Sequence, residues 1–225
     1  MPINIAIDGP VGAGKSSIAD QVARRLNILH LDTGAMYRAV GLAVNKAGVD
    51  MHDEAAVTAL CEAGKAHVDV EYVDGAQKTY VNGEDVTPFI RTQEAGTAAS
   101  CISRYAAVRR MLVARQREIA ATQPMLMDGR DIGTVVLKDA PVKIYLTASA
   151  EARATRRMKQ LQEKGENPDF EEILKEVNAR DYQDMNREVD PLRCADDAVV
   201  VDSSEINFEE TVQAILRVVE EKHVG

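Results

Sequence analysis

The sequence predicts an α/β fold in which a five-stranded parallel sheet is flanked by helices. Two observations favour this class. Short apolar segments alternate with helical patterns, and these segments lie at residues 3–7, 27–32, 125–131, 142–147 and 198–203. The length of 225 residues is sufficient for one such core with insertions but short for two. We therefore expect a single domain over residues 1–225, with the carboxyl ends of its strands at one edge of the sheet.

The composition is that of an ordinary soluble globular protein, with 45% hydrophobic and 28% charged residues. A net charge of −9 repels long polyanions, so a nucleic acid polymer is not an expected partner. Cys61, Cys101 and Cys194 are far apart, which favours reduced thiols over a disulfide framework or a zinc site. No signal peptide, membrane-spanning segment or exposed apolar stripe is recognisable. We expect a cytoplasmic monomer without a membrane partner.

The first strand is followed by a complete match to the phosphate-binding motif G-x-x-x-x-G-K-[ST], which a helical pattern follows in turn. Its glycines let successive backbone N–H groups point at phosphate oxygens. Lys15 is expected to reach the β- and γ-phosphates, and Ser16 supplies a hydroxyl suited to Mg²⁺. A turn that binds no ligand is the alternative. The residues expected to bind ATP are Gly9, Pro10, Val11, Gly12, Ala13, Gly14, Lys15, Ser16 and Ser17.

A second candidate phosphate contact follows the second strand. Asp32 or Thr33 is a suitable N-cap, and Met36 and Val40 begin a helical pattern, so Arg38 is predicted in the second turn of a helix. An arginine in a helix usually faces solvent. This one, however, lies near the carboxyl edge of the sheet, where open α/β sheets bind ligands. Both interpretations of Arg38 stay open.

Residues from about 33 to 100 depart from the alternation of strand and helix. After a predicted helix over 52–65, apolar and polar residues alternate at 67–73 and 78–81, and Asp-Gly and Asn-Gly turns follow these segments. This pattern predicts a small antiparallel β insertion, and an insertion near the ligand-binding edge of the sheet is expected to shape the choice of substrate. A long helical region is expected from about residue 92 to 121, with most of its arginines in solvent. Its polar residues include Ser100, Arg104, Arg109, Arg110, Arg115 and Arg117.

The third strand ends in the charged run Asp128-Gly129-Arg130-Asp131. Two acids and an arginine crowded at the end of a strand lower stability unless a ligand or a metal shares the site. A simple Asp-Gly turn is the alternative.

Two helices with basic faces follow the fourth strand. Arg153 and Arg157 lie one turn apart on one face, so their charges repel unless an anion sits between them. Residues 160–169 predict a mobile loop, and residues 153–170 are therefore a candidate lid that excludes water.

The next helix, over residues 170–187, carries Arg180, Asp184 and Arg187 on one face. This pattern indicates a second anion site, and a solvated face of salt bridges is the alternative. A final helix is expected over residues 208–221.

Together these features predict phosphoryl transfer. The chain combines a triphosphate loop with many arginines, and it shows no Ser-His-Asp set and no cluster of metal ligands. The transition state of phosphoryl transfer needs positioning and positive charge more than covalent chemistry, and lysine, arginine and Mg²⁺ supply both. Two groups of arginines far apart in the sequence indicate two anions, which are ATP and an acceptor that is itself a phosphate.

Several of these segments resemble the bacterial cytidylate kinases, a family of P-loop nucleoside monophosphate kinases. The resemblance covers essentially the whole chain. It rests on Ile7-Asp8-Gly9-Pro10 with the loop, Leu31-Asp32-Thr33-Gly34-Ala35-Met36-Tyr37-Arg38, Ile90-Arg91-Thr92, Asp128-Gly129-Arg130-Asp131-Ile132-Gly133-Thr134-Val135-Val136, and Arg180-Asp181 through Arg187. It implies a three-layer P-loop NTPase-type fold. It also implies transfer of the ATP γ-phosphoryl group to CMP or dCMP, with Mg²⁺ as the ATP complex, in pyrimidine nucleotide metabolism.

The resemblance further implies roles for individual residues. The residues implied to bind CMP are Thr33, Arg38, Ser100, Arg109, Arg130, Asp131, Arg180 and Asp184, of which Ser100, Arg109 and Asp131 contact the cytosine. The residues implied in catalysis are Lys15, Arg130, Arg153, Arg157 and Arg187. The family often has serine in place of Thr33, and some members have Gly-Thr where this chain has Ser16-Ser17. Which of these two hydroxyls meets Mg²⁺, with Ser16 as our expectation, is therefore open.

Two other functions remain as alternatives at this point. One is another small P-loop kinase with a different acceptor, although the arginine set at 180–187 argues against an uncharged one. The other is a GTP-driven switch. Such switches use an Asn-Lys-x-Asp element for guanine, and the nearest match here, Asn45-Lys46-Ala47-Gly48, has glycine in place of the acid.

Overall fold

The structure is a computed structural model that describes residues 3–223. Its residues form two compact units, one of residues 3–28 together with 125–223 and one of residues 29–124. The first unit contains the phosphate-binding loop. The second contains the antiparallel sheet that the alternating pattern predicted.

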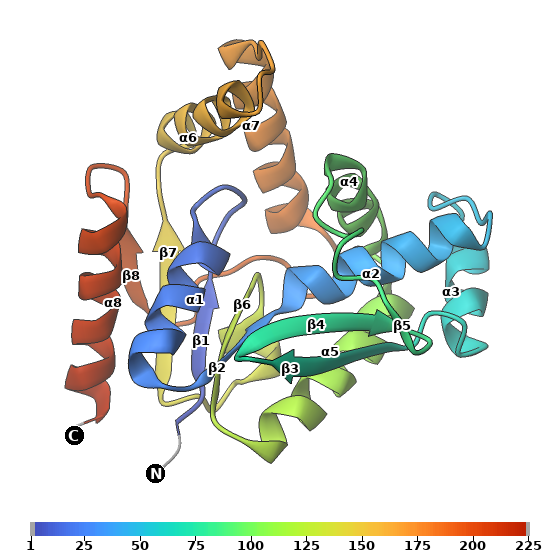
Figure 1. Ribbon diagram of the computed structural model, residues 1–225, viewed down its shortest axis with the longest axis horizontal. Helices are drawn as coiled ribbons and strands as arrows, with labels where there is room; N and C mark the ends of the chain where they lie inside the picture. The colour runs from blue at the N-terminus through green and yellow to red at the C-terminus, as the bar shows by residue number, and fades with distance from the viewer. Residues whose placement is uncertain (1–2, 224–225) are drawn as a thin grey trace. The chain divides into compact units, whose positions relative to one another are not determined.

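The first unit is built on four parallel strands (Figure 1). Its elements are β1 (Ile5–Asp8), α1 (Lys15–Leu26), β6 (Met125–Gly129), the π-helix η1 (Ile132–Val136), β7 (Val142–Thr147), α6 (Ala150–Glu163), α7 (Phe170–Asn186), β8 (Val199–Asp202) and α8 (Phe208–His223). Strand β1 pairs in parallel with β6 and β7, and β7 pairs in parallel with β8. With β2 (Leu29–Asp32), the sheet has the strand order β2-β6-β1-β7-β8. The predicted five-stranded sheet is therefore confirmed.

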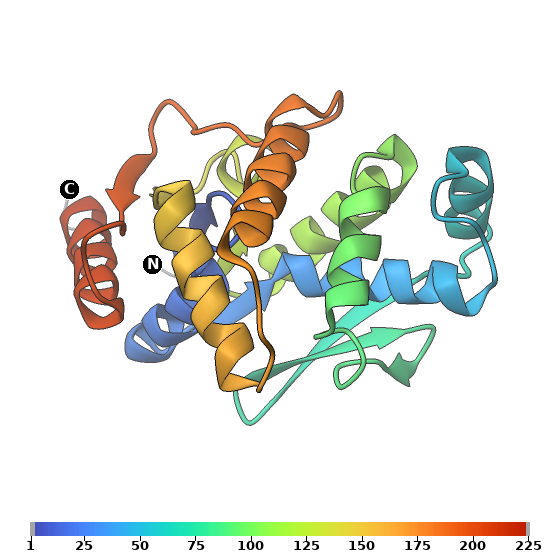
Figure 2. The same ribbon diagram turned by 90° about the horizontal axis from the view of Figure 1, so that it is seen from above.

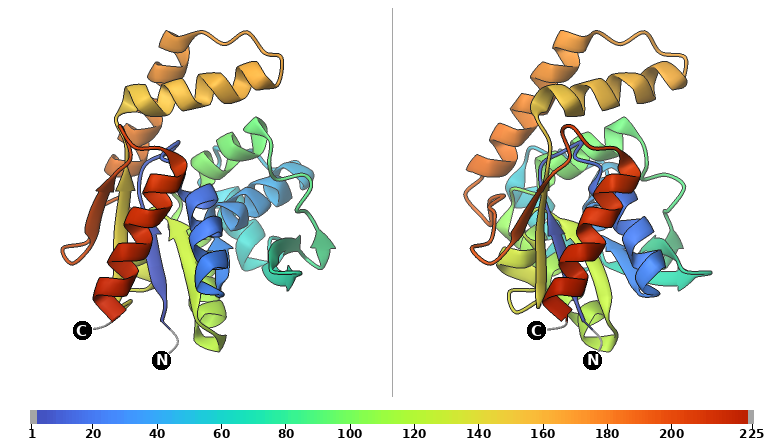
Figure 3. Two further views of the ribbon diagram at one scale, coloured as in Figure 1. Left: turned by 60° about the vertical axis from the view of Figure 1, so that its left-hand side comes forward. Right: turned by 90° about the vertical axis from the view of Figure 1, so that its left-hand side faces the viewer.

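Helices α1 and α8 cover one face of this sheet (Figure 3). Ile5 and Ile7 of β1 are fully buried, and Val22 of α1 and Val212 and Ile215 of α8 belong to the same apolar cluster. Strands buried in this way carry nearly continuous apolar runs, which is the pattern that identified them in the sequence. The cluster fixes β1 and α1, and thereby the loop between them.

Helices α6 and α7 form an antiparallel pair with a small apolar core of their own (Figure 2). Ala154, Ile173 and Val177 are buried in it, and Met158 and Leu161 pack against them. Helix α6 continues to Glu163, so the loop expected at residues 160–169 is shorter than predicted.

The second unit combines helices with an antiparallel sheet of order β3-β4-β5. Its elements are β2 (Leu29–Asp32), α2 (Thr33–Lys46), α3 (Glu54–Glu62), β3 (Val68–Val73), β4 (Ala76–Val81), β5 (Glu84–Asp85), α4 (Gln93–Ile102) and α5 (Ala106–Thr122). The register pairs Val68 with Val81 and Val73 with Ala76. The turn between β3 and β4 therefore lies at Asp74-Gly75, as the sequence predicted.

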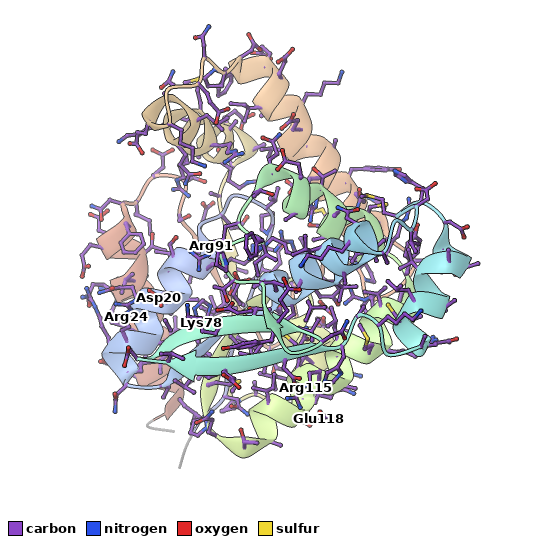
Figure 4. The ribbon with its side chains drawn as sticks, turned by 45° about the vertical axis from the view of Figure 1, so that its right-hand side comes forward. Asp20, Arg24, Lys78, Arg91, Arg115 and Glu118 are labelled. Carbon is purple, nitrogen blue, oxygen red and sulfur yellow. The ribbon has the colours of Figure 1, made fainter. Side chains whose placement is uncertain are left out.

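The long helical region expected from about residue 92 to 121 is present but divided. The structure has two helices, α4 and α5, separated at residues 103–105, where Ser103 is the C-cap of α4 and Tyr105 the N-cap of α5. No glycine or proline marks this break. The expectation that the arginines of this region are mostly in solvent fails for Arg109, which is only 1% exposed. Arg115 agrees better with that expectation. It forms ion pairs with Glu118 of α5 (Figure 4) and with Asp69 of β3.

None of the helices in the part of the chain that the structure covers is long and apolar enough to cross a membrane.

Candidate active site

The phosphate-binding loop joins β1 to α1, and its backbone passes very close to β7. A Cβ atom on Gly9 would lie 1.9 Å from the carbonyl oxygen of Leu146, and the φ angle of Gly9 is +157°. Both features exclude a side chain at this position. The close approach holds the loop against the carboxyl edge of the sheet, where ligands bind in open α/β folds.

Lys15 is the first residue of α1 and is buried. Its Nζ donates to the carbonyl oxygen of Pro10 at 2.7 Å. Burial, followed by the neighbouring charge of Arg130, lowers the pKa of Lys15 to about 7, although Asp128, Asp184 and Asp8 act in the opposite direction. Lys15 therefore shares its electrostatic environment with charged residues at the ends of β1 and β6 and on α7.

Ser16 and Asp128 form a pair suited to a hydrated magnesium ion. The hydroxyl of Ser16 donates to Oδ2 of Asp128 at 2.9 Å, and Asp128 is 3% exposed at the end of β6. Within residues 3–223 there is no group of three or more His, Cys, Asp or Glu side chains that could hold a metal. Mg²⁺ bound to a nucleotide needs only one or two protein oxygens, because phosphates and waters supply the others. The donor set of a hydroxyl and a carboxylate fits this requirement.

Asp8, the last residue of β1, accepts two backbone hydrogen bonds. Its Oδ1 accepts from the N–H of Ile132 and its Oδ2 from the N–H of Gly133, both at 2.7 Å. Burial nevertheless raises the pKa of Asp8 to about 7, and the two hydrogen bonds only partly oppose this rise. The carboxyl group is therefore half protonated near neutral pH.

The shifted pKa values of Asp8 and Lys15 predict a pH dependence of stability. From about pH 4 to about pH 7 the folded protein holds a proton on Asp8 that the unfolded chain has released, so the free energy of unfolding falls as pH rises. From about pH 7 to about pH 10 the unfolded chain holds a proton on Lys15 that the folded protein has lost, so the free energy of unfolding rises with pH. Urea denaturation of the wild type and of Asp8→Asn at several pH values checks this. The difference in the free energy of unfolding between the wild type and Asp8→Asn should change between pH 4 and 7 and stay constant above pH 7. A difference that is constant over the whole range would contradict the raised pKa of Asp8.

Arg130 and Asp184 form an ion pair in which the carboxylate is buried and the arginine is partly exposed. Nε of Arg130 donates to Oδ2 of Asp184 at 2.8 Å, and Nε of Arg180 lies 3.5 Å from Oδ1 of the same carboxylate. Asp184 is 1% exposed. Burial raises the pKa of Asp184, but the charges of Arg130 and Arg180 outweigh burial and hold it below the ordinary value. One carboxylate therefore orients two of the arginines that the sequence identified.

Arg187 lies beside Asp131. Its Nη2 is 3.6 Å from Oδ1 of Asp131, and its Nε donates to the carbonyl oxygen of Asp190 at 2.8 Å. The side chain of Arg187 is only 4% exposed. The one-face pattern on the helix over 170–187 therefore indicates a buried charged cluster rather than a solvated face.

Arg153 and Arg157 have different environments although both lie on α6. Arg153 is 4% exposed, and its guanidinium binds both oxygens of Asp181 on α7, at 3.0 and 2.6 Å, and the carbonyl oxygen of Val11 in the loop, at 2.9 Å. Arg157 is partly exposed and makes no hydrogen bond or ion pair with any residue in the described part of the chain. Of the two, Arg157 has the guanidinium available for a phosphate, whereas Arg153 links α6, α7 and the loop.

In the second unit, Asp32 organises the start of α2. Its Oδ1 caps the helix by accepting from the N–H of Ala35 at 2.9 Å, and its Oδ2 accepts from Nη2 of Arg38 at 2.7 Å. Thr33 is 3% exposed directly after this cap. Asp32 is thus the N-cap, and it holds Arg38 against the first turn of the helix rather than in solvent.

Ser100 and Arg109 are brought together through the break between α4 and α5. Nη1 of Arg109 donates to the carbonyl oxygen of Ser103 at 3.2 Å, and the hydroxyl of Ser103 donates to the carbonyl oxygen of Ser100 at 3.0 Å. The guanidinium carbon of Arg109 lies 5.6 Å from the centre of the Tyr37 ring. A cation held over an aromatic ring in this way is fixed in orientation.

The comparisons with known proteins bear on this geometry. The family model described as cytidylate kinase matches residues 5–221. The chain belongs to the cytidylate kinase family. It is 47% identical to a cytidylate kinase of Caldicellulosiruptor bescii over 214 residues, 95% of this chain and 94% of the relative. It is 44% identical to a cytidylate kinase of Bacillus licheniformis over 218 residues, 97% of this chain and 96% of the relative.

Among solved structures, an uncharacterized protein from Eubacterium ventriosum has a similar fold. The TM-score is 0.56 at 13% sequence identity, and the match covers 98% of this chain and 99% of the other. At this identity the likeness concerns the fold alone. Membership in the cytidylate kinase family, which rests on the sequence matches, identifies the protein as an enzyme that phosphorylates a nucleotide.

Sequence reasoning missed three acids of this site. It gave no role to Asp8, did not pair Asp128 with Ser16, and did not identify Asp181 as the partner of Arg153. Two of these contacts join residues more than a hundred positions apart, which no local pattern reveals. For Arg153 and Asp181, the available signal was that they lie on two consecutive helices, which can pack against each other.

Proposed function

We propose that the chain transfers the γ-phosphoryl group of ATP to CMP or dCMP, giving ADP and the diphosphate. The observation that carries this proposal is the pair of arginines on one buried carboxylate, where Arg130 donates to Asp184 and Nε of Arg180 lies 3.5 Å from it. This cluster supplies positive charge for a second anion, and it is near enough to Lys15 of the phosphate-binding loop to shift the pKa of that lysine. A kinase with an uncharged acceptor does not need that second group, and a GTP-driven switch needs a guanine element that the sequence lacks. Family membership supports the same choice.

The donor side uses the first unit. Backbone N–H groups of the loop, to which Pro10 contributes none, bind the phosphates, and Lys15 neutralises charge on the β- and γ-phosphates. Ser16 and Asp128 would hold the hydrated Mg²⁺, which would supply positive charge against the charge that develops on the phosphates. The choice of Ser16 over Ser17 is supported by the hydrogen bond from Ser16 to Asp128.

The transferring group needs positive charge on its equatorial oxygens. Arg187 provides it from a buried position and Arg130 from a partly exposed one, and Arg157 adds a guanidinium from α6. Arg153 contributes by holding α6 to the loop at Val11 rather than by touching the phosphoryl group. Guanidinium groups held by carboxylates do not reorganise during the reaction, which is the condition for effective electrostatic stabilisation.

The acceptor is recognised by residue types that match its chemistry. Arginine can donate to the ring carbonyl and N3 of cytosine, and a carboxylate or hydroxyl can accept from its exocyclic amine. Asp131, Ser100 and Arg109 are assigned to the base. Arg180 and Asp184 are assigned to the acceptor phosphate and sugar, and Thr33 and Arg38 to the acceptor phosphate.

The organisation of the protein is part of the proposal. Residues 1–225 act as a single kinase domain, with a monophosphate-binding insertion at about 33–100 and a lid at about 153–170. The protein acts as a monomer in the cytoplasm. The three cysteines, which are free thiols, suit that compartment.

A coupled assay of ADP release tests the proposal. With ATP and Mg²⁺, we expect turnover with CMP and dCMP that is at least about tenfold above that with UMP or AMP, because the pairing of donors and acceptors with cytosine is lost for the other bases. The assay without an acceptor measures background ATP hydrolysis. Preferred turnover with another nucleotide would contradict the assignment of the base contacts, and the absence of any acceptor-dependent turnover would contradict the kinase itself.

A further inference from the structure

The π-helix η1 begins directly after Arg130 and Asp131, and its N-terminus is capped in an unusual way. Asp131 occupies the N-cap position with φ −147° and ψ 25°, but its side chain makes no capping hydrogen bond. Aspartate is one of the preferred N-cap residues because its carboxylate accepts from the first free N–H groups of a helix. Another acceptor must therefore serve the first N–H groups of η1.

Asp8 is that acceptor, although it lies on a different strand. Its two carboxylate oxygens accept from the N–H groups of Ile132 and Gly133, the first two residues of η1, both at 2.7 Å. Asp8 is 4% exposed at the end of β1, and its backbone pairs with Gly129 in the sheet. The cap is thus held by the rigid centre of the sheet.

The sequence of η1 is adapted to this contact. A Cβ atom on Gly133 would lie 3.4 Å from Oδ2 of Asp8 and 3.2 Å from Cδ of Lys143. The distance to Lys143 is tighter than an ordinary van der Waals contact and the distance to Asp8 is at its lower limit, so a larger residue at 133 displaces these side chains by a few tenths of an ångström. Glycine permits the close approach that two short hydrogen bonds require.

We propose that Asp8 is a positioning residue, which caps η1 in place of Asp131 and thereby leaves the Asp131 carboxylate to recognise the acceptor base. This inference rests on the proposed role of Asp131 in base recognition. An acid that capped its own helix would turn its oxygens toward the N–H groups of residues 133 and 134. With Asp8 as the cap, Oδ1 of Asp131 lies instead 3.6 Å from Nη2 of Arg187, in the charged cluster.

The burial of Asp8 supports a functional reason for keeping an acid there. Burial shifts its pKa to about 7, so the ionised form is costly in the folded protein. Costly buried acids are concentrated where a protein needs them for its site. Here the acid connects the strand that leads into the phosphate-binding loop with the segment that carries Arg130 and Asp131.

The test uses Asp8→Asn, assayed at pH 8, where the wild-type carboxyl group is mostly ionised. Asparagine keeps one acceptor oxygen but turns an N–H₂ group toward the second backbone N–H. We expect the KM for CMP to rise about tenfold or more, and the preference for CMP over UMP in kcat/KM to fall by a similar factor, because a hydrogen bond to a charged group is lost. The KM for ATP should change less than about twofold, which a general loss of structure would not allow.

A second variant separates this role from an effect of Asp8 on the neighbouring loop. Gly133→Ala disturbs the same contact from η1 and leaves β1 and the loop unchanged, so it should change the KM for CMP and the CMP preference in the same direction. Gly96→Ala in α4, where an added Cβ meets nothing within 4 Å, is the matched control. If Asp8→Asn fails to fold, Gly133→Ala carries the test.

Asp131→Ala is the reference variant that separates the positioning role of Asp8 from the base contact of Asp131. If Asp131→Ala loses the CMP preference while Asp8→Asn and Gly133→Ala keep it, the positioning role is overturned and the base contact stands. If Asp131→Ala keeps the preference, the base contact is overturned, and the positioning role is overturned with it. Equal weakening of ATP and CMP binding in Asp8→Asn would also overturn the positioning role. Loss of the preference in all three variants supports it.

Discussion

Lys15→Ala is expected to lower kcat by about a thousandfold or more, because it removes the positive charge nearest the β- and γ-phosphates in the transition state. Its ammonium group is buried and fixed by the carbonyl oxygen of Pro10, so no other side chain replaces it. The loss should appear in kcat more than in the KM for ATP, because backbone N–H groups still bind the phosphates.

The same variant should not lose thermal stability. Burial lowers the pKa of Lys15 to about 7, which means that the folded protein holds the charged form at a cost. Steady-state kinetics and a thermal melt of the same preparation provide the measurement. Lys222→Ala, at an exposed position of α8, is the control for loss of a lysine. A wild-type-like kcat in Lys15→Ala would refute the assignment of the phosphate-binding loop.

Asp184→Ala is expected to lower the free energy of unfolding by about 1–3 kcal/mol, because the partly buried arginines Arg130 and Arg180 lose this carboxylate. Asp184 receives a hydrogen bond from Arg130 and pairs with Arg180, and it is 1% exposed. Turnover should fall as well, since Arg130 loses the carboxylate that orients it. Urea denaturation measures the stability, and Asp139→Ala at an exposed position is the matched control, with an expected change within about 0.5 kcal/mol.

A double variant checks the physical cause. Replacing both Arg130 and Asp184 by apolar residues of similar size removes the carboxylate together with its closer arginine, so that only Arg180 loses an ion-pair contact. It should therefore cost less stability than Asp184→Ala alone, which affects both arginines. If the double variant is less stable than Asp184→Ala, the loss does not arise from an uncompensated charge. A loss below about 1 kcal/mol in Asp184→Ala itself would contradict the ion pair as the structure shows it.

The sequence was sufficient to predict the elements whose pattern is local. The five strands were recognisable because each is an apolar run followed by a helical pattern, and the turn at Asp74-Gly75 because of its residue types. The phosphate-binding loop was recognisable because its motif is contiguous.

What the sequence could not predict depends on residues that meet only in the folded chain. The break between α4 and α5 occurs at Ser103, Arg104 and Tyr105, none of which ends a helix by its own conformational preference. The burial of Arg109 follows from that break, because its guanidinium binds the carbonyl group of Ser103. The cap from Asp8 to η1 spans 124 residues and had no local signal.

The partner of Arg153 on α6 was also not predictable from local sequence. Their spacing correctly placed them one turn apart, but the repulsion argument assumed an anion between them, and the structure has Arg153 bound to Asp181 of the next helix. A like-charged pair on one helix thus identifies a need for negative charge without saying whether a ligand or the protein supplies it.

The contacts of Arg153 also restrict how α6 and α7 can move. The guanidinium of Arg153 joins the first turn of α6 to Asp181 and to the carbonyl oxygen of Val11, from a position that is 4% exposed. As long as these contacts persist, the amino-terminal turn of α6 cannot travel relative to the loop. A swing of the far ends of both helices must therefore pivot about Arg153, with the largest displacement near residues 163–170 and almost none beside the phosphate-binding loop.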